Sequence, residues 1–277
     1  MLSILTSTQS FVASAASAPA LRLASSPIMQ LRELVAPLEE RVPADVPAAR
    51  ARYMTPAPAV PDTSILVQGG SLRTWSYRSP DTEQVQVVLG TEGRPLDADV
   101  ELWHGPDNTP VKMRVYTEDG DLRPFTAVIE TPRSPNTVAI RNIGQVEFPI
   151  RANVVDTDIL VPTAECLASP MTIQGGALRT YPFDPSIDSV QVLLKTDGRP
   201  LNSRVELLQG PNNNKQVIEL YTEDGLDRPF LCVLETPGSG NVVRIVNTAP
   251  IEFPMVAAVV PYSINTDHTN EVILGGD

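Results

Sequence analysis

The phrase YTEDG, followed two residues later by RPF, occurs twice in the sequence, at residues 116–125 and 221–230. The two copies lie 105 residues apart, and residues 85–149 align with 190–254 without a gap, with about half of the positions identical. A repeat of this length is a duplicated domain rather than a short solenoid unit. The sequence therefore predicts two homologous domains in tandem, with a pseudo-twofold relation between them.

Each copy consists of short apolar segments separated by turn residues. In the first copy the expected strands are 65–77 (two strands around a Gly69-Gly70 turn), 85–89, 99–103, 111–117, 124–131, 136–143 and 146–155. The second copy repeats this order from about residue 171 to 260. Strands spaced roughly ten residues apart are typical of antiparallel sandwiches and barrels. We therefore expect an all-β fold of two antiparallel, jelly-roll-like β-sandwich domains, at 64–162 and 163–262.

The segment before the first repeat has a different composition. Residues 1–32 contain no acidic residue and are rich in Ala and Ser, which is the composition of a cleavable targeting segment. We assign 1–29 to an organelle-targeting leader, with a disordered N-terminus as the alternative. Residues 30–63 form an arm that is rich in Pro and Ala. The spacing of its first leucines predicts one or two helical turns, which Pro37 interrupts.

Residues 263–277 form a tail that contains a third copy of the opening strand. The repeats open with ILVQGG and MTIQGG, and residues 272–277 read VILGGD. An exposed sheet edge is a template for another strand. The tail could add a strand to a neighbouring molecule, cap its own domain, or remain free. The candidate assembly residues in it are Val272, Ile273, Leu274, Gly275 and Gly276.

Overall charge excludes two classes of partner. The net charge is −12, whereas binding to nucleic acid or to anionic lipid needs a basic face. No apolar run approaches the ~18 residues that a membrane-spanning helix needs. We therefore expect no nucleic-acid partner and no membrane span.

The repeated acidic pairs are the most obvious candidates for chemistry. They are Glu118 with Asp119 and Glu223 with Asp224, and an arginine follows each pair, at Arg123 and Arg228. Asp-Gly is a strong hairpin signal, because type I′ turns need positive φ. We therefore expect a hairpin turn braced by an ion pair to the following arginine. Calcium binding and catalysis are the less favoured alternatives, since calcium needs more oxygen ligands at short spacing than this motif supplies.

Other residues with catalytic or metal-binding potential are scattered. The chain has two cysteines, Cys166 and Cys232, and two histidines, His104 and His268, which is too few and too dispersed for a zinc site. The QGG motif precedes a strand and not a helix, so it does not have the form of a phosphate-binding loop. We therefore predict a protein that is not an enzyme and has no metal or cofactor.

The motif set as a whole resembles a known family. QGGxLRT, VQVxL, GRPL, VELxxGP, YTEDG, RPF, ETP and EFP occur in this order, twice over, and QGGxLRT contributes Arg73 and Arg179. Over roughly residues 65–260 this set resembles the pyrenoid shell proteins of diatoms and related algae. The resemblance implies a plastid-targeting leader, a location at the pyrenoid periphery of a chloroplast, and a homo-oligomeric lattice around Rubisco. It implies a structural role in carbon dioxide concentration, with Rubisco or a pyrenoid linker protein as further candidate partners.

A tandem carbohydrate-binding or adhesion module is the alternative that the same fold would allow. Such a module would show exposed aromatic residues in both copies. Trp75 and Tyr181 occupy equivalent places and could stack on a sugar, although aromatic residues of a β-sandwich more often lie in the core.

Overall fold

The computed structural model describes residues 63–265, all of which belong to one unit. The expected leader, the arm up to residue 62 and the tail from residue 266 lie outside the described residues. The first repeat forms β1 (Ile65–Val67), β2 (Leu72–Tyr77), β3 (Gln84–Gly90), β4 (Leu96–His104), β5 (Asn108–Thr117), β6 (Phe125–Glu130), β7 (Asn136–Asn142) and β8 (Ile150–Val155).

The second repeat follows the same order after one short helix. Its elements are α2 (Ala164–Ala168), β9 (Met171–Ile173), β10 (Leu178–Pro182), β11 (Ile187–Lys195), β12 (Leu201–Gln209), β13 (Asn214–Thr222), β14 (Phe230–Glu235), β15 (Asn241–Asn247) and β16 (Met255–Ile264). The predicted all-β fold with antiparallel pairing is confirmed. The expected strands are present, but the one expected at 146–155 begins only at residue 150. The domain boundaries at 64–162 and 163–262 stay predictions.

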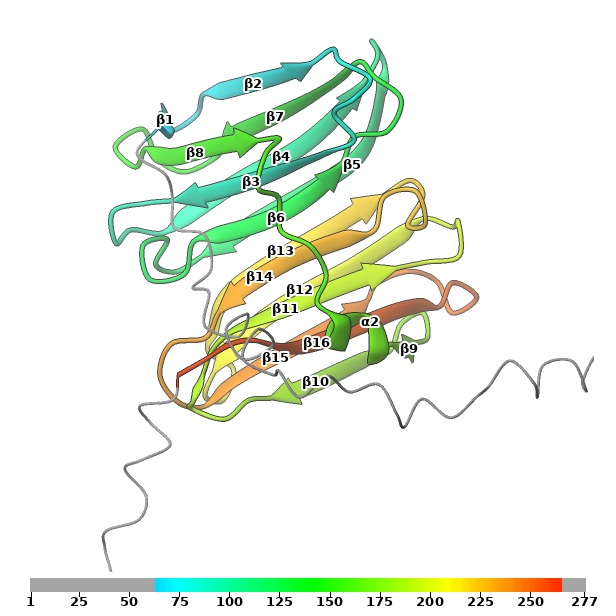
Figure 1. The fold of residues 1–277 in the computed structure, drawn as a ribbon. Coiled ribbons are helices and arrows are strands. Elements are labelled where there is room, and N and C mark those ends of the chain that lie inside the picture. Colours follow the sequence, from blue (N-terminus) through cyan, green and yellow to red (C-terminus); the bar gives the residue numbers. More distant parts are fainter. Residues whose placement is uncertain (1–62, 266–277) are drawn as a thin grey trace, which may run out of the picture. The chain divides into compact units, whose positions relative to one another are not determined.

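The strands form two eight-stranded sheets, and each repeat contributes four strands to each sheet (Figure 1). Sheet A has the order β1-β8-β3-β6-β14-β11-β16-β9, and sheet B has the order β10-β15-β12-β13-β5-β4-β7-β2. The repeats meet edge to edge, through β6 with β14 in sheet A and through β5 with β13 in sheet B. Each sheet is therefore continuous across the junction, which the repeat pattern alone did not predict.

The register of both junction pairs is pseudo-twofold symmetric. In sheet B, Arg114 lies opposite Glu219, and these two residues are equivalent positions of the repeats, 105 residues apart. In sheet A, Ala127 lies opposite its own equivalent, Cys232. Such isologous pairing uses the same edge of both partners, as in a twofold dimer.

Alternating side chains fill the space between the sheets with a shared core. On β4, Leu96, Ala98, Val100 and Leu102 are completely buried, while the residues between them are partly exposed. One continuous hydrophobic cluster contains buried residues of both repeats. Fully burying a Val or Leu side chain contributes about 1.5–3 kcal/mol. The junction is therefore part of the core and not a contact between two separate cores.

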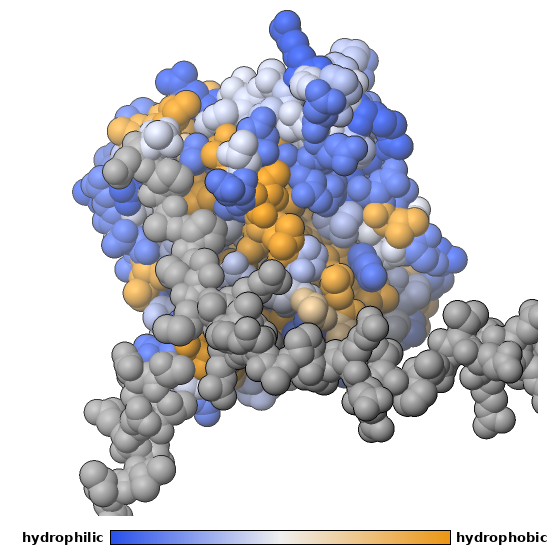
Figure 2. All heavy atoms as spheres, viewed as in Figure 1, coloured by the Kyte–Doolittle hydropathy of each residue, from blue (hydrophilic) through white to orange (hydrophobic). Residues whose placement is uncertain are grey.

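The segment between the repeats crosses the outer face of sheet A. Gln86 of β3 accepts a hydrogen bond from Leu160 N at 2.7 Å, and Gln191 of β11, its equivalent, accepts one from Thr163 N at 2.8 Å. Thr163 also caps α2, whose Cys166 is buried in a second cluster on this face. Figure 2 shows hydrophobic residues in the middle of this face. The two glutamines satisfy backbone donors that would otherwise be buried without a partner.

Candidate assembly surface

The YTEDG segments are crossovers between the two sheets, so the predicted hairpin is wrong. β5 belongs to sheet B and β6 to sheet A, and residues 118–124 connect them. Gly120 and Gly225 are not among the residues with positive φ. They are needed for space: a Cβ on Gly120 would lie 2.6 Å from Thr91 Oγ1, and one on Gly225 would lie 2.5 Å from Thr196 Oγ1.

Each crossover is held against the neighbouring GRPL segment. Gly120 N donates to Arg94 O at 3.0 Å, and Thr91 N donates to Gly120 O at 3.2 Å. Asp119 Oδ1 accepts the backbone N–H groups of Asp121 and Leu122 at 3.0 and 3.1 Å. The second repeat has the equivalent bonds, with Asp224 as the acceptor. The acidic pair therefore contributes a turn-capping aspartate, and in each repeat the YTEDG and GRPL motifs together build one corner of the shared sandwich.

The predicted ion pairs from Arg123 and Arg228 to the acids do not form within 4.0 Å among the described residues. Arg123 is only 3% exposed, and its Nη2 donates to Gln209 Oε1 of the other repeat at 2.9 Å. Burial lowers the pKa of Arg123, while the charges of Glu118 and Asp119 oppose this shift. The guanidinium of Arg123 therefore links the repeats instead of pairing with the acids of its own turn.

Arg228 is the equivalent residue at the other half of the junction, and it is 5% exposed. The position equivalent to Gln209 is His104, whose Nδ1 instead makes a hydrogen bond with Asn136 Oδ1 at 3.1 Å. The Nε atom of Arg228, like that of Arg123, is buried without a hydrogen-bond partner. Burial and the nearby charge of Arg133 lower the pKa of Arg228.

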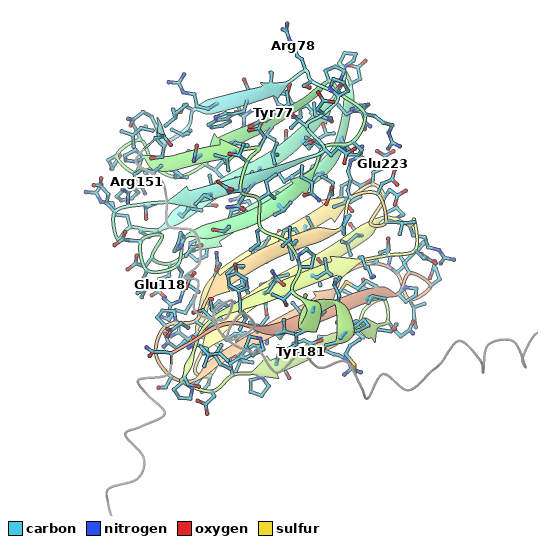
Figure 3. All side chains as sticks on the ribbon, viewed as in Figure 1. Tyr77, Arg78, Glu118, Arg151, Tyr181 and Glu223 are labelled. Atoms are coloured by element: carbon cyan, nitrogen blue, oxygen red, sulfur yellow. The ribbon has the colours of Figure 1, made fainter. Side chains whose placement is uncertain are left out.

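The glutamates of the two motifs lie at the junction and contact the other repeat. Glu118 Oε2 pairs with Lys215 Nζ at 2.5 Å, and Glu223 Oε2 accepts a hydrogen bond from Asn108 Nδ2 at 3.3 Å. Figure 3 places Glu118 and Glu223 at opposite sides of the molecule. The structure thus brings Glu118, Asp119 and Arg123 to one end of the junction and their copies to the other, so the six residues do not form one site.

The other predicted assembly residues lie far from the junction in the strand order. Arg73 is on β2 and Arg179 on β10, the two edge strands of sheet B, and both side chains are exposed. In the ladder they lie opposite the buried Ile140 and Ile245, on the core-facing side of the sheet. A charge on the inner side of an edge strand opposes pairing with another strand. Val272, Ile273, Leu274, Gly275 and Gly276 lie outside the described residues.

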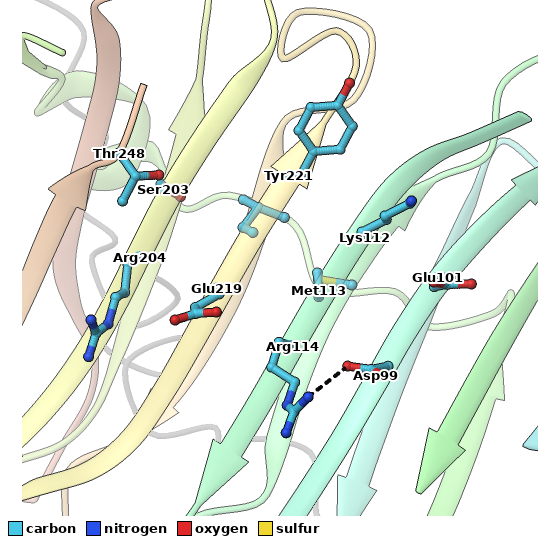
Figure 4. A pocket seen from close by; sticks show the side chains of 11 residues that line it. Asp99, Glu101, Lys112, Met113, Arg114, Ser203, Arg204, Glu219, Tyr221 and Thr248 are labelled. Carbon is cyan, nitrogen blue, oxygen red and sulfur yellow. Dashed lines mark ion pairs between the residues drawn. The ribbon is translucent and has the colours of Figure 1, made fainter. Parts of the chain in front are cut away.

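An open groove of about 520 Å³ lies where the repeats meet in sheet B (Figure 4). Its charged lining residues are Asp99, Glu101, Lys112, Arg114, Arg204 and Glu219. Arg114 pairs with Asp97 at 3.1 Å and with Asp99 at 3.7 Å. Because acids and bases are equal in number and partly paired, the groove has no excess charge with which to select an ionic ligand.

The cysteines are in environments that suppress reactivity. Both are buried and unpaired. Burial raises the pKa of Cys166 to about 11 and raises that of Cys232 still further. A thiol with so high a pKa is protonated at neutral pH and is a poor nucleophile and ligand. In residues 63–265 no group of three or more Cys, His, Asp and Glu residues could hold a metal ion.

Sequence reasoning missed two buried asparagines. The amide of Asn142 donates to Val67 O at 2.9 Å and to Phe148 O at 2.8 Å, and that of Asn247 donates to Ile173 O at 3.0 Å and to Phe253 O at 2.9 Å. Asparagine stands at this position in both copies, and that identity was the available signal.

The fold defines the class of the protein, an all-β sandwich built from two joined repeats. A family model described as diatom pyrenoid shell protein matches residues 59–261, which is most of the chain, and the chain belongs to that family. Membership supports a structural role in the shell of the pyrenoid. Comparison with curated proteins gave no match. In the part of the chain described here, no helix has the length and hydrophobicity to cross a membrane.

Proposed function

We propose that the protein assembles with copies of itself into a sheet or tube that surrounds the Rubisco-containing pyrenoid of a chloroplast. The layer limits the loss of carbon dioxide and so supports carbon fixation, and the leader directs the chain to the plastid. The match to the shell family carries this proposal. The protein acts by covering a surface and not by catalysis.

The architecture supports this role through its rigidity. Two continuous sheets span both repeats, and the core is continuous across the junction. A unit of this kind has no hinge between its halves, so contacts at its two ends are held at a fixed separation. Fixed contacts at both ends are what a repeating layer requires.

The tail supplies the link to a neighbour, and β16 offers an edge that fits it. Within the described residues, β16 pairs with β9 only at residues 255–257, so residues 258–264 pair on one side alone. In the first repeat, Tyr77 Oη donates to Val154 O on the corresponding edge at 3.1 Å. Phe183 stands in the place of Tyr77 and has no hydroxyl group. The edge of β16 is therefore the more open of the two, and a strand such as 272–274 of a second copy could pair with it.

Electron microscopy and sedimentation of the chain without residues 1–29 test the proposal. We expect extended assemblies, and we expect deletion of 272–277 to abolish them while the thermal unfolding of the domains stays unchanged. A control variant has residues 266–271 replaced by Gly and Ser. It keeps the length of the tail and the VILGGD motif, and it should assemble. A strictly monomeric full-length protein at high concentration contradicts self-assembly, whereas normal assembly of the deletion variant contradicts only the role of the tail.

The carbohydrate-binding alternative has one observation in its favour. Tyr116 and Tyr221 are equivalent residues, and they are 40% and 36% exposed on either side of the junction in sheet B. Trp75 and Tyr181 instead pack against the core. Glycan binding by a monomeric protein that is lost in Tyr116→Ala and Tyr221→Ala would favour this alternative over the shell.

A further inference from the structure

In each repeat, the loop before the last strand connects the two sheets next to the opening strand. In the first repeat it is residues 143–149, between β7 and β8, and in the second it is residues 248–254, between β15 and β16. We refer to these two segments as the corner loops. Their tips read QVEFP and PIEFP. Both copies contain the EFP motif, and the proposed link between the tail and β16 gives this motif no role.

An arginine of the GRPL motif clamps each corner loop. Arg94 Nη1 donates to Glu147 O at 3.0 Å, and its guanidinium lies 5.5 Å from the centre of the Phe148 ring. Arg199 makes the same two contacts in the second repeat, at 2.9 Å to Glu252 O and 5.6 Å to the Phe253 ring. Each clamp combines a hydrogen bond and a cation–π contact on consecutive residues.

The buried asparagines and the QGG glycines fix the same loops from the other side. Asn142 bonds to the carbonyl of Phe148 and Asn247 to that of Phe253, as described above. A Cβ on Gly69 would lie 1.9 Å from Gln145 O, and one on Gly175 would lie 1.7 Å from Pro250 O. The QGG, GRPL and EFP motifs and the asparagine, which are far apart in each repeat, therefore converge to hold one loop in one conformation.

The residue that these contacts present to solvent is aliphatic in both copies. Val146 is 72% exposed and Ile251 is 77% exposed, the largest exposed fractions of any large hydrophobic side chain in residues 63–265. A single exposed aliphatic residue is ordinary on a protein surface. Here, however, the two residues before the tip differ between the copies: Gly144 and Gln145 in the first, Ala249 and Pro250 in the second. A β-branched aliphatic residue nevertheless stands at the tip of both loops.

We propose that the two corner loops are the contact points through which a second copy of this chain packs laterally, with Val146 and Ile251 buried in the contact. The proposal rests on the self-assembly proposed above and names the surface that it uses. A loop that is already rigid loses little conformational entropy on binding, so even a small apolar tip can contribute to affinity.

Two features of the structure favour a second copy as the occupant. The pseudo-twofold junction places equivalent corner loops in both halves of one rigid unit, so each molecule has two copies of the same contact. A partner with repeated surfaces of its own can use both, and contacts between unlike ends propagate. Strand pairing at the sheet B edges is opposed by Arg73 and Arg179 on their inner side. Growth past the sheet B edges therefore needs a contact other than strand pairing, and the corner loops supply one.

Charged substitutions at the tips test the contact. We expect Val146→Asp and Ile251→Asp each to raise the concentration needed for assembly by about tenfold, because a carboxylate must be desolvated in the contact. Both side chains are exposed in the monomer, so thermal unfolding should not change. Val161→Asp is the matched control, since Val161 is 66% exposed on the linker between the repeats and has no place in the proposed contact. It should assemble like the wild type.

A cross-linking experiment identifies the occupant. A benzophenone maleimide attached to Val146→Cys or Ile251→Cys labels one site, because the native thiols are 1% and 0% exposed. Irradiation of the assembled protein should give covalent dimers whose cross-linked peptides come from this chain. If the wild type assembles, and the Asp variants assemble equally well or the dimers do not form, the corner loops are not the contact. If the wild type does not assemble, the proposed function itself fails.

Discussion

The two halves of the junction have the same backbone bonds and different side-chain bonds. Glu118 N donates to Lys215 O at 2.9 Å, and Glu223 N donates to Pro110 O at 2.8 Å. Lys215 also pairs with Glu118 through its side chain, whereas Pro110, its equivalent, has no group that could pair with Glu223. Main-chain pairing of the edges is thus symmetric, and the polar side chains around it are not.

The two repeats also differ in a polar side-chain contact on the outer face of sheet A. Glu130 Oε1 accepts a hydrogen bond from Gln84 at 2.7 Å, and this bond opposes the rise that burial causes in its pKa. In the second repeat the residue equivalent to Gln84 is Ser189, whose hydroxyl is buried without a partner. Burial and the charge of Asp188 raise the pKa of Glu235 to about 7.

These differences show which features of the fold are fixed by geometry. The crossover glycines and the main-chain ladder are the same in both repeats, because a side chain at Gly120 or Gly225 would overlap a neighbouring threonine. Polar partners can change one at a time, because losing one costs about 1–3 kcal/mol and leaves the backbone in place. The second repeat therefore contains buried polar groups without a partner. Replacing a neighbouring residue by its equivalent from the first repeat should supply that partner.

The largest effect should come from Glu235→Gln. With a pKa near 7 instead of its usual 4.5, folded Glu235 keeps a proton that the unfolded chain has lost between those pH values. The free energy of unfolding therefore falls as pH rises from about 4.5 to 7, and it stays low above that. The amide is neutral at every pH, so at pH 8 the variant should be more stable than the wild type by up to about 3 kcal/mol.

Denaturant unfolding at pH 5 and pH 8 measures this difference. The matched control is Glu130→Gln, which removes a carboxylate that already has a hydrogen-bond donor and should stabilise the protein less at pH 8. Equal gains from the two variants, or no change in the pH dependence with Glu235→Gln, would show that the outer faces of the two repeats are electrostatically alike.

The second prediction compares the two buried arginines. Arg123→Met should cost about 2 kcal/mol, because it removes a charge-assisted hydrogen bond and leaves Gln209 Oε1 without its donor. At the position equivalent to Gln209 stands His104, which bonds to Asn136, so Arg228→Met breaks no bond of this kind, while the methionine keeps much of the apolar stem. Its cost should be close to zero, since a buried charge without a strong partner stabilises little.

Chemical denaturation of both variants gives the comparison directly, provided that the denaturant dependence of the two transitions is the same. A loss from Arg228→Met as large as that from Arg123→Met would mean that Arg228 has a partner of equal strength, and the two halves of the junction would then be energetically equivalent.

The strands were predictable because their signal is local. Leu96, Ala98, Val100 and Leu102 alternate with polar residues, and alternation over a few residues specifies a strand with one buried face. The net charge of −12 depends on composition alone, and it argues against nucleic acid as a partner whatever the fold. The repeat length predicted two homologous halves. It did not predict that the halves share both sheets, because that depends on which edges of the two folded repeats meet.

The errors concern contacts between residues distant in the sequence. Asp-Gly at 119–120 has the local pattern of a hairpin, and what makes it a crossover is its packing against Thr91 and Arg94. Arg123 was expected to pair with acids four or five residues away, but its partner Gln209 lies 86 residues further along the chain. No local pattern could identify that partner, although the exchange of Gln209 for His104 between the copies marks the position as one where the halves differ.

The smallest effect should come from His104→Gln, which gives the second half of the junction the residue of the first. By the pseudo-twofold relation, Gln at 104 would lie where its side-chain oxygen can accept from Arg228, as Gln209 does from Arg123. The bond of His104 with Asn136 is lost in exchange. A hydrogen bond to a charged group contributes about 1.5–3 kcal/mol and a neutral one about 0.5–1.5, so the net gain should be about 1 kcal/mol.

The double variant with Arg228→Met separates this bond from other effects of the substitution. If the gain arises from the new bond, His104→Gln should add nothing once Arg228 is absent, and the coupling energy of the cycle should equal the gain in the single variant. The reverse exchange, Gln209→His, should destabilise the protein, because Arg123 would then be buried without its acceptor. If His104→Gln stabilises the protein equally when Arg228 is absent, the gain does not come from a bond to Arg228. In that case His104 does not weaken Arg228 in the wild type, and this difference between the halves does not affect stability.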